Sequence, residues 1–517
     1  MRGRSRGGRR AGRGRGSQQR PAEGGTEGKT EARTPRRAAR KVEPPTLEMV
    51  VGQLFMVGIP PDATWEDSIR DHLANHYGGV FLRRSNLRSV DRARRAIHEL
   101  RRVIGRGLPP LVGIDEEGGL VTNLGHLTTP APSAAALGAA DDPDLTQDVY
   151  HGIGDKLRAL GMNLLCAPVL DVNSEPANPV IGTRAFGSTP ETVTAQGMAA
   201  LRGIQASEVV ACVKHFPGHG ATRLDSHLAL PEVKADLATL QARDLAPFAE
   251  AFKQEKPAPM VMTAHVAYPA LDRSGLPATL SKAILQDLLR KDMGFHGLVL
   301  SDAMEMKAIA DRMPPGKAAL QALEAGVDIL LYPLDPAMAA EAYRTVLDAV
   351  RSKKLSEERL RASAERVHLL RRELRAVEWL RNDAAQDLLE FEHEQTFFTA
   401  AHRAVQLEGN AGVLADMAAL GGTKLMVVPR ALDQNHPIMV EVLKEQLEPA
   451  GFTVVDVSPR VTAEELAGAE ARAAQAAAVV VATVSRGPMS EESRKLVKAL
   501  TVRDLPKVGV ALLDPAD

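Results

Sequence analysis

Cysteine is nearly absent from this chain of 517 residues, which has only two, Cys166 and Cys212. So few thiols exclude a disulfide framework and a cysteine-rich zinc site. Each cysteine lies in an apolar, strand-like run, so both are predicted to be reduced core residues. Long apolar runs are absent too, because no stretch approaches the roughly 18 residues of a membrane span. With 44% hydrophobic and 25% charged residues, the composition is that of a soluble globular protein of two or more domains.

Between Met1 and Val42 the chain has no Val, Leu, Ile, Phe or Met. Residues 1–46 as a whole carry 14 Lys and Arg against 4 Asp and Glu. Such a segment cannot bury enough surface to offset its chain entropy, so it is predicted to be a disordered Arg/Gly-rich tail. It also lacks the apolar centre of a signal peptide, and a cytoplasmic location is expected. Three interpretations stay open: an arm that binds nucleic acid or phosphate, a solubilising tail, or a start codon placed too far upstream.

Short apolar runs rich in Val, Ile and Leu recur after the tail, with helical periodicity between them. Continuous runs of this kind are typical of strands that are buried on both faces. Eight such units in about 290 residues predict an α/β fold with a (β/α)8 TIM-like barrel, and a doubly wound open sheet is the alternative. The predicted strands are 54–59, 78–82, 110–115, 163–171, 209–215, 259–265, 297–302 and 326–332.

Ionisable residues end five of these strands: Asp115, Asp171, His215, His265 and Asp302. In a barrel the C-terminal ends of all strands meet on one face, where the loops build the active site. A single aspartate at a strand end is more often a helix cap than a catalyst. Five ionisable strand ends together favour the barrel and predict a shared polar pocket.

The loop after the fifth predicted strand is rich in histidine, in the sequence KHFPGHGATRLDSHLALP from Lys214 to Pro231. A loop that only connects two elements would consist of Gly, Pro, Asn and Ser. In an extended segment, Asp225 and His227 project to the same side. A carboxylate bonded to imidazole fixes its tautomer and makes it an acid/base group that works near neutral pH.

Several motifs in a fixed order resemble glycoside hydrolase family 3, in particular its β-N-acetylhexosaminidase branch, the NagZ-like enzymes. They are IDEEGG (114–119), APVLDVN (167–173), IGTRAFG (181–187), KHFPGHG with DSH (225–227), and GFHGLVLSDAMEM (294–306). The resemblance covers residues 46–340 and continues more weakly through 401–410. It implies a retaining mechanism without a cofactor, which needs a carboxylate nucleophile and a proton donor at one anomeric centre.

The resemblance assigns the nucleophile to Asp302, and the Ser301 hydroxyl is expected to help hold that carboxylate ionised. It assigns the acid/base role to His227 with Asp225 as its partner. A histidine leaves less negative charge beside the glycosyl-enzyme than a carboxylate would, so phosphate is also considered as an acceptor.

Substrate binding is predicted for Asp115, which can accept two hydroxyl hydrogen bonds, and the resemblance places Arg184, Lys214 and His215 around the terminal sugar. His219 is considered either as a second ligand in the loop or as a brace for it. Asp171 is predicted to brace the loop that carries Arg184, and His265 to line the pocket.

The chain departs from the family at EGGLVTN, where members commonly have EGGRVxR. Leu120 replaces one arginine, and Asn123 stands where a second, sugar-contacting arginine would be. Asn123 keeps a donor without the charge, which bears on the substrate more than on the reaction class.

Beyond the barrel, assigned to residues 47–345, a helical linker is predicted for 346–399 and a smaller α/β sandwich domain for 400–517. Its predicted strands are 424–429, 452–457, 477–484 and 507–513, and at this length two interpretations stay open, a small domain or an incomplete one. Neither part has a phosphate-binding glycine loop or a metal-ligand cluster.

The sequence therefore predicts an exo-acting β-N-acetylhexosaminidase for terminal N-acetylglucosamine, with peptidoglycan fragments as substrates. A β-glucosidase, a β-xylosidase or a phosphorylase of the same family is the alternative within the enzymes. A binding protein without catalysis on the same scaffold, which either senses a muropeptide or tethers to nucleic acid through the basic tail, is the alternative outside them. Carbohydrate is thus the expected partner, and no membrane contact is expected.

Overall fold

The computed structural model describes residues 45–104, 108–374, 393–405, 412–433, 436–437, 440–458, 461–483, 491–501 and 506–511. The tail predicted for residues 1–46 lies almost wholly outside these ranges. Within them, every helix is too short or too polar to traverse a lipid bilayer.

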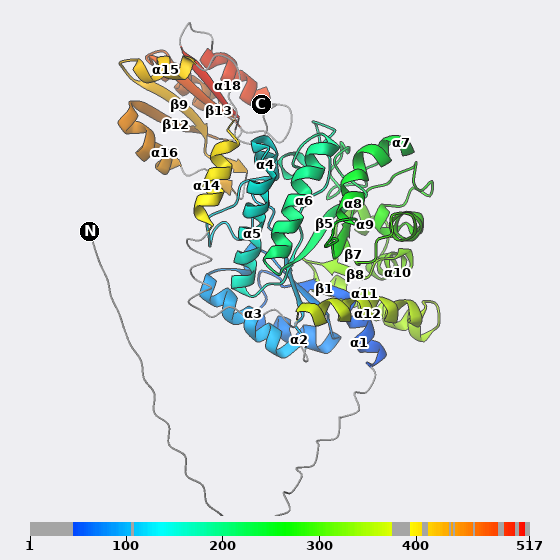
Figure 1. Cartoon of the computed structure of the whole chain (residues 1–517). Coiled ribbons are helices and arrows are strands. Elements are labelled where there is room, and N and C mark those ends of the chain that lie inside the picture. Colours follow the sequence, from blue (N-terminus) through cyan, green and yellow to red (C-terminus); the bar gives the residue numbers. More distant parts are fainter. Residues whose placement is uncertain are drawn as a thin grey trace, which may run out of the picture. The chain divides into compact units, whose positions relative to one another are not determined.

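Eight parallel strands close into a barrel in chain order, with β1 paired to both β2 and β8 (Figure 1). The predicted (β/α)8 barrel is confirmed, and the open-sheet alternative is excluded by the pairing of β1 with β8. Each strand overlaps one predicted apolar run. The strands are β1 (Phe55–Gly58), β2 (Gly79–Leu82), β3 (Leu111–Ile114), β4 (Leu164–Leu165), β5 (Val210–Phe216), β6 (Met260–Thr263), β7 (Leu298–Ala303) and β8 (Ile329–Tyr332).

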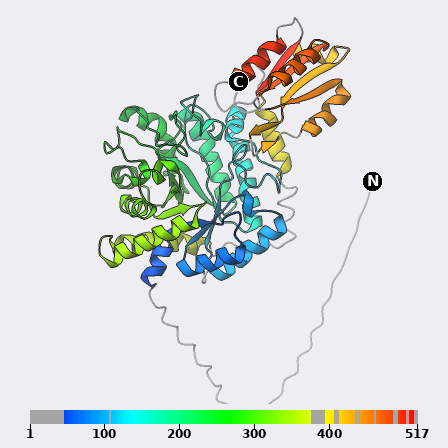
Figure 2. The same cartoon turned by 180° about the vertical axis from the view of Figure 1, so that it is seen from behind.

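Helices surround the strands on the outside, as both views show (Figures 1 and 2). They begin at caps of the expected kind: the side chains of Thr46, Thr64, Ser133, Asp142 and Thr189 each accept a bond from a first-turn amide. The α-helices around the barrel are α1 (Leu47–Gly52), α2 (Trp65–Asn75), α3 (Val90–Ile104), α4 (Ala134–Ala140), α5 (Pro143–Leu160), α6 (Pro190–Ala206), α7 (Leu237–Thr239), α8 (Ala246–Ala251), α9 (Lys307–Ala310), α10 (Pro315–Ala325), α11 (Pro336–Arg351) and α12 (Glu357–Leu374). Two π-helical segments, η3 (Leu240–Asp244) and η5 (Ala283–Asp292), complete this layer.

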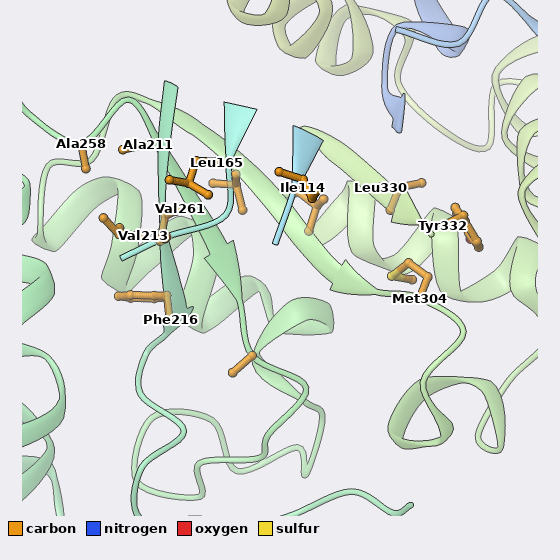
Figure 3. Packing of buried hydrophobic residues seen from close by; sticks show 14 of the residues in the cluster. Ile114, Leu165, Ala211, Val213, Phe216, Ala258, Val261, Met304, Leu330 and Tyr332 are labelled. Atoms are coloured by element: carbon orange, nitrogen blue, oxygen red, sulfur yellow. The ribbon is translucent and has the colours of Figure 1, made fainter. Parts of the chain in front are cut away.

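The buried residues form two layers, because successive side chains of a strand point to opposite faces. The outer layer, between strands and helices, includes Ile114, Leu165, Val213, Val261 and Leu330 (Figure 3). The inner layer fills the barrel with the alternate residues. Among its members are Leu111, Leu164, Cys166, Val210, Cys212, Leu298 and Leu300, so both cysteines are buried inside the barrel.

The helix α12 closes the barrel at the N-terminal ends of its strands. Val367 and Leu374 join the inner cluster, and the Arg371 guanidinium donates to the carbonyls of Leu108 and Pro109 just before β3. The segment 346–399, predicted as a linker, thus includes a helix that packs on the barrel. Most of its remainder, 375–392, lies outside the described residues.

The C-terminal part contains a sheet of four parallel strands in the order β12-β9-β13-β14. All four coincide with predicted strands, which confirms the second α/β unit. The strands are β9 (Lys424–Pro429), β12 (Phe452–Val457), β13 (Ala478–Thr483) and β14 (Lys507–Ala511), beside a short pair β10 (Ala431–Asp433) and β11 (His436–Pro437). The helix α14 (Glu394–Arg403) packs on α4 and α5, and its Phe397 and Ala400 belong to the outer layer of the barrel core. The helices beside the C-terminal sheet are α15 (Gly412–Ala419), α16 (Val440–Leu447), α17 (Ala463–Ala473) and α18 (Glu491–Thr501).

Candidate active site

Strand periodicity places three predicted site residues at the mouth of the barrel. Asp115, Lys214 and Asp302 each continue the inward-facing series of their strand, two positions beyond Gly113, Cys212 and Leu300. Inward-facing residues at C-terminal strand ends line the active-site face of such barrels. The ends of β3, β5 and β7 were predicted to share one pocket. The alternation of inward and outward side chains along each strand explains why these three residues point into it.

A buried ion cluster forms the floor of this site. The Lys214 ammonium lies 2.6 Å from Asp115 Oδ1 and 2.5 Å from Glu117 Oε1. The Arg184 guanidinium binds Glu117 through two bonds of 2.8 Å. Burial alone would raise the pKa of Glu117, but Arg184 and Lys214 hold it at about 2. Asp115 and Glu117 likewise raise the pKa of Lys214 in spite of its burial.

Glu117 is a site residue that the sequence analysis missed. Its signal was present in the IDEEGG motif: the two cations predicted near the sugar, Lys214 and Arg184, need carboxylate partners where they are buried. Because Glu117 satisfies Arg184, the Asp115 side chain, which is one-third exposed, keeps its second oxygen for a ligand.

Asp171 orients the strand end that follows Lys214. Its Oδ2 lies 2.6 Å from His215 Nδ1, and its Oδ1 accepts bonds from the amides of His215 and His219. The carboxylate fixes the proton of His215 on Nδ1, so that Nε2 accepts from Arg184 Nη2 at 3.2 Å. Asp171 thus contacts the histidine-rich loop directly, whereas its predicted role was to brace the loop of Arg184.

Asp302 is held as a carboxylate at the end of β7. Burial alone would raise its pKa, but His265, His215 and a 2.7 Å bond from the Ala303 amide lower it, with a smaller contribution from His227. Ser301 is not among the groups that lower this pKa, and its hydroxyl instead accepts from the Leu331 amide of β8. That expectation was wrong because Ser301 and Asp302, as neighbours in a strand, point to opposite faces.

His265 lies buried beside this strand end. Its ring nitrogens contact Thr279 Oγ1 at 2.7 Å and the Ala303 carbonyl at 2.9 Å, so it supports the backbone that carries Asp302. Burial lowers its pKa.

The DSH triplet forms the predicted dyad at the surface of the site. His227 Nδ1 lies 2.8 Å from Asp225 Oδ1, and the side chain of His227 is 61% exposed. With Nδ1 occupied by the carboxylate, Nε2 is the nitrogen that exchanges protons with a ligand or with water. Leu224 and Leu228, on either side of the triplet, are exposed apolar side chains.

Two predicted ligands are engaged by the protein itself. His219 is 1% exposed, and its ring nitrogens contact the hydroxyls of Thr222 and Ser226, which leaves neither for a sugar. Asn123 donates to the Asp115 carbonyl and accepts from the Arg84 amide, so only one amide hydrogen remains.

Glycine is required in the histidine-rich loop where the backbone passes close to its neighbours. A Cβ on Gly220 would lie 1.9 Å from the Val172 carbonyl oxygen, and Gly218 has a φ of 132°. Among the described residues, no group of three or more His, Cys, Asp or Glu is arranged to hold a metal ion.

Comparison with known proteins gives one family. The model for the glycosyl hydrolase family 3 N-terminal domain matches residues 46–370. Beta-hexosaminidase A of Pseudoalteromonas piscicida is 38% identical over 289 residues, which cover 52% of this chain and 48%, about half, of that protein. A beta-hexosaminidase of Methylococcus capsulatus (strain ATCC 33009 / NCIMB 11132 / Bath) is 37% identical over 284 residues, 54% of this chain and 81% of the relative.

The solved structures include one that is similar along most of the chain. It is a glycoside hydrolase family 3 beta-N-acetylglucosaminidase from Paenibacillus sp. str. FPU-7, with a TM-score of 0.82, 34% identity and coverage of 90% of both chains.

Proposed function

Because the chain belongs to glycosyl hydrolase family 3, and with it to the glycoside hydrolases, we propose that it is a retaining exo-β-N-acetylhexosaminidase. The observation that carries the proposal is the combination of a half-buried, ionised Asp302 with the Asp225–His227 dyad, whose imidazole is exposed. Retaining enzymes need one carboxylate that attacks and a second group that first donates and then accepts a proton.

In the proposed first step, Asp302 attacks the anomeric carbon while His227 Nε2 donates its proton to the departing glycosidic oxygen. The carboxylate suits this role because it is ionised and because the Ala303 amide leaves its second oxygen unhindered. In the second step His227, now neutral, takes a proton from water, which attacks the glycosyl-enzyme. Asp225 stabilises the imidazolium in both protonation changes.

The terminal sugar is proposed to lie over the ion cluster. Asp115 accepts from sugar hydroxyls and is itself held by Lys214, while the two cations and two carboxylates of the cluster leave the floor without net charge beneath the developing oxocarbenium ion. N-Acetylglucosamine is the proposed sugar because the relatives above are named hexosaminidases or an N-acetylglucosaminidase. Peptidoglycan fragments are proposed as its source on the family resemblance.

A chromogenic β-N-acetylglucosaminide compared with the matching β-glucoside tests the sugar. We expect the acetamido substrate to have the higher kcat/KM, and the Asp302→Ala variant to lose turnover. A 2-fluoro or 5-fluoro sugar should add one glycosyl mass to the peptide that contains Asp302. An active enzyme without that adduct would remove Asp302 as the nucleophile.

Transfer to phosphate is a second candidate, favoured by the use of an imidazole in place of a second carboxylate at the dyad. A neutral His227 repels an incoming phosphate less than a carboxylate would. Assays with and without inorganic phosphate distinguish the two activities through the product, which is the free sugar or the sugar 1-phosphate.

A further inference from the structure

Ser226, between the two members of the dyad, is turned inward while its neighbours face solvent. It is 1% exposed, whereas the side chains of Asp225 and His227 are 29% and 61% exposed. In the proposed mechanism Asp225 and His227 have roles, but the buried hydroxyl between them has none.

Ser226 contacts two other segments of the site, one through its hydroxyl and one through its carbonyl. Its hydroxyl lies 2.9 Å from His219 Nε2, in the loop after β5, and its carbonyl accepts from the Ala308 amide at 3.4 Å. Ala308 belongs to α9, which begins five residues after Asp302. One residue therefore connects the segment of the acid/base dyad to the segments that follow the strands of Lys214 and Asp302.

The direction of the His219–Ser226 bond follows from the partners of Thr222. The Thr222 hydroxyl donates to the His219 carbonyl at 3.1 Å and accepts from Asn178 Nδ2 at 3.3 Å. Having one proton, it must also accept from His219 Nδ1–H at 3.0 Å. The neutral ring then has Nε2 as its acceptor, so the Ser226 hydroxyl donates to it.

The backbone of His219 is itself held by two further contacts. Its amide donates to Asp171 at 2.6 Å, and its carbonyl accepts from Asn178 at 2.9 Å. Burial lowers the pKa of His219 to about 4, so the ring stays neutral and keeps this acceptor over the neutral pH range.

We propose that His219 and Ser226 are positioning residues that set His227 in register with Asp302, an inference that rests on the proposed function. Neither touches the reacting atoms. Their bond instead fixes the backbone from which His227 projects. Proton transfer depends on such alignment, since a misplacement of about 1 Å costs on the order of 100-fold in rate.

Two substrates separate positioning from folding in the test. N,N′-Diacetylchitobiose has a sugar leaving group that needs a proton, whereas 2,4-dinitrophenyl β-N-acetylglucosaminide releases a phenolate that needs none. For both, kcat/KM reports formation of the glycosyl-enzyme. Ser226→Ala should lower kcat/KM for the disaccharide about 10- to 100-fold and for the dinitrophenyl substrate less than about threefold.

Ser207→Ala is the matched control, because it also removes a buried hydroxyl, one that donates to the Ile204 carbonyl at the end of α6. It should change kcat/KM for both substrates by one common factor. The dinitrophenyl activity of the Ser226 variant serves as its measure of folding.

Two variants of His219 sharpen the test. In place of His219, the amide group of glutamine reaches the position of the ring atom Nε2. The shorter asparagine reaches only the position of Nδ1. His219→Gln should therefore keep the acceptor for Ser226 and retain the ratio of the two kcat/KM values. His219→Asn should shift that ratio as Ser226→Ala does, with no further shift in the double variant.

Equal losses on both substrates in Ser226→Ala, or equal behaviour of His219→Gln and His219→Asn, would overturn the positioning role. Failure of the proposed function would look different, because the wild-type chain would then hydrolyse neither substrate.

Discussion

At the scale of single residues, two cations share one fully buried carboxylate at the mouth of the barrel. Lys214 and Arg184 both bind Glu117, which is 1% exposed. Removing one partner of a buried ion pair costs about 3–5 kcal/mol, since the other charge stays without compensation.

Glu117→Gln should accordingly lower the free energy of unfolding at pH 7 by about 3–5 kcal/mol, measured by urea denaturation. It should also lower kcat/KM, because Lys214 loses one of the two carboxylates that position it. Glu99→Gln is the control: its pair with Arg102 is exposed and should contribute little. Equal stability of the two variants would contradict the role of the cluster.

The same residue predicts a pH dependence. The pKa of Glu117 is about 2 in the folded chain against an ordinary 4.5. Its contribution to stability is therefore complete above about pH 4.5 and is lost as the pH falls toward 2. Between these values, unfolding free energies should decline more steeply for the wild type than for Glu117→Gln. Parallel curves would show that Glu117 is not ionised as described.

His227→Ala tests the dyad. Substrates with a poor leaving group should lose most of their turnover, while an aryl glycoside should form the glycosyl-enzyme and then stall, seen as a burst before a slow steady state. Azide, which attacks without deprotonation, should accelerate that steady state and give the β-glycosyl azide. Asp225→Asn should lose less activity and shift the pH profile. Equal losses on all leaving groups without azide rescue would make His227 structural.

Sequence patterns predicted the strand-end residues well and their supporting partners poorly. Lys214 and Asp302 lie on strands and Asp115 directly follows one, so the period of two fixes where each side chain points. Asp171, His219 and Ser226 owe their contacts to the path of a loop with close backbone approaches, such as that of Gly220 to Val172. No periodicity encodes such a path.

At the scale of elements, Asp328 precedes β8 and holds the N-terminal end of this strand to its neighbours. This fully buried carboxylate accepts bonds of 2.6 Å from Arg290 and Arg366, 2.5 Å from Ser363 and 3.0 Å from the Val299 amide. It thereby joins η5, β7 and α12 at the N-terminal ends of the strands. The strands could be predicted because their apolar runs are continuous. The spacing of apolar residues in α12 predicts a helix but does not indicate which end of the barrel this helix covers.

Asp328→Ala should lower the free energy of unfolding by about 3–5 kcal/mol, because two arginines and a backbone amide lose their acceptor. The site lies at the opposite ends of the strands, so kcat/KM of the folded protein on an aryl substrate should stay within about twofold. Thermal melting and initial rates at low temperature measure the two effects. A large loss of kcat/KM without loss of stability would show that the ends of the barrel are coupled.

At the scale of the whole molecule, every residue of the proposed mechanism falls between Asp115 and Asp302. Deleting residues 1–44, which leaves the Thr46 cap of α1 in place, should keep kcat/KM on a small substrate within about twofold. Gel-shift assays with single-stranded RNA, before and after the deletion, test the arm hypothesis, and binding should weaken as salt rises. A large loss of activity would mean that the tail contributes to the site.

The pairing of β1 with β8 has a consequence for synthesis of the chain. Phe55 lies opposite Leu330, a partner 275 positions later in the sequence. Ribosomes add roughly 5–20 residues per second, so the first strand waits on the order of 15–50 s before its second neighbour exists. During that interval β1 offers one unpaired edge with apolar residues on both faces, which is the kind of surface that chaperones cover.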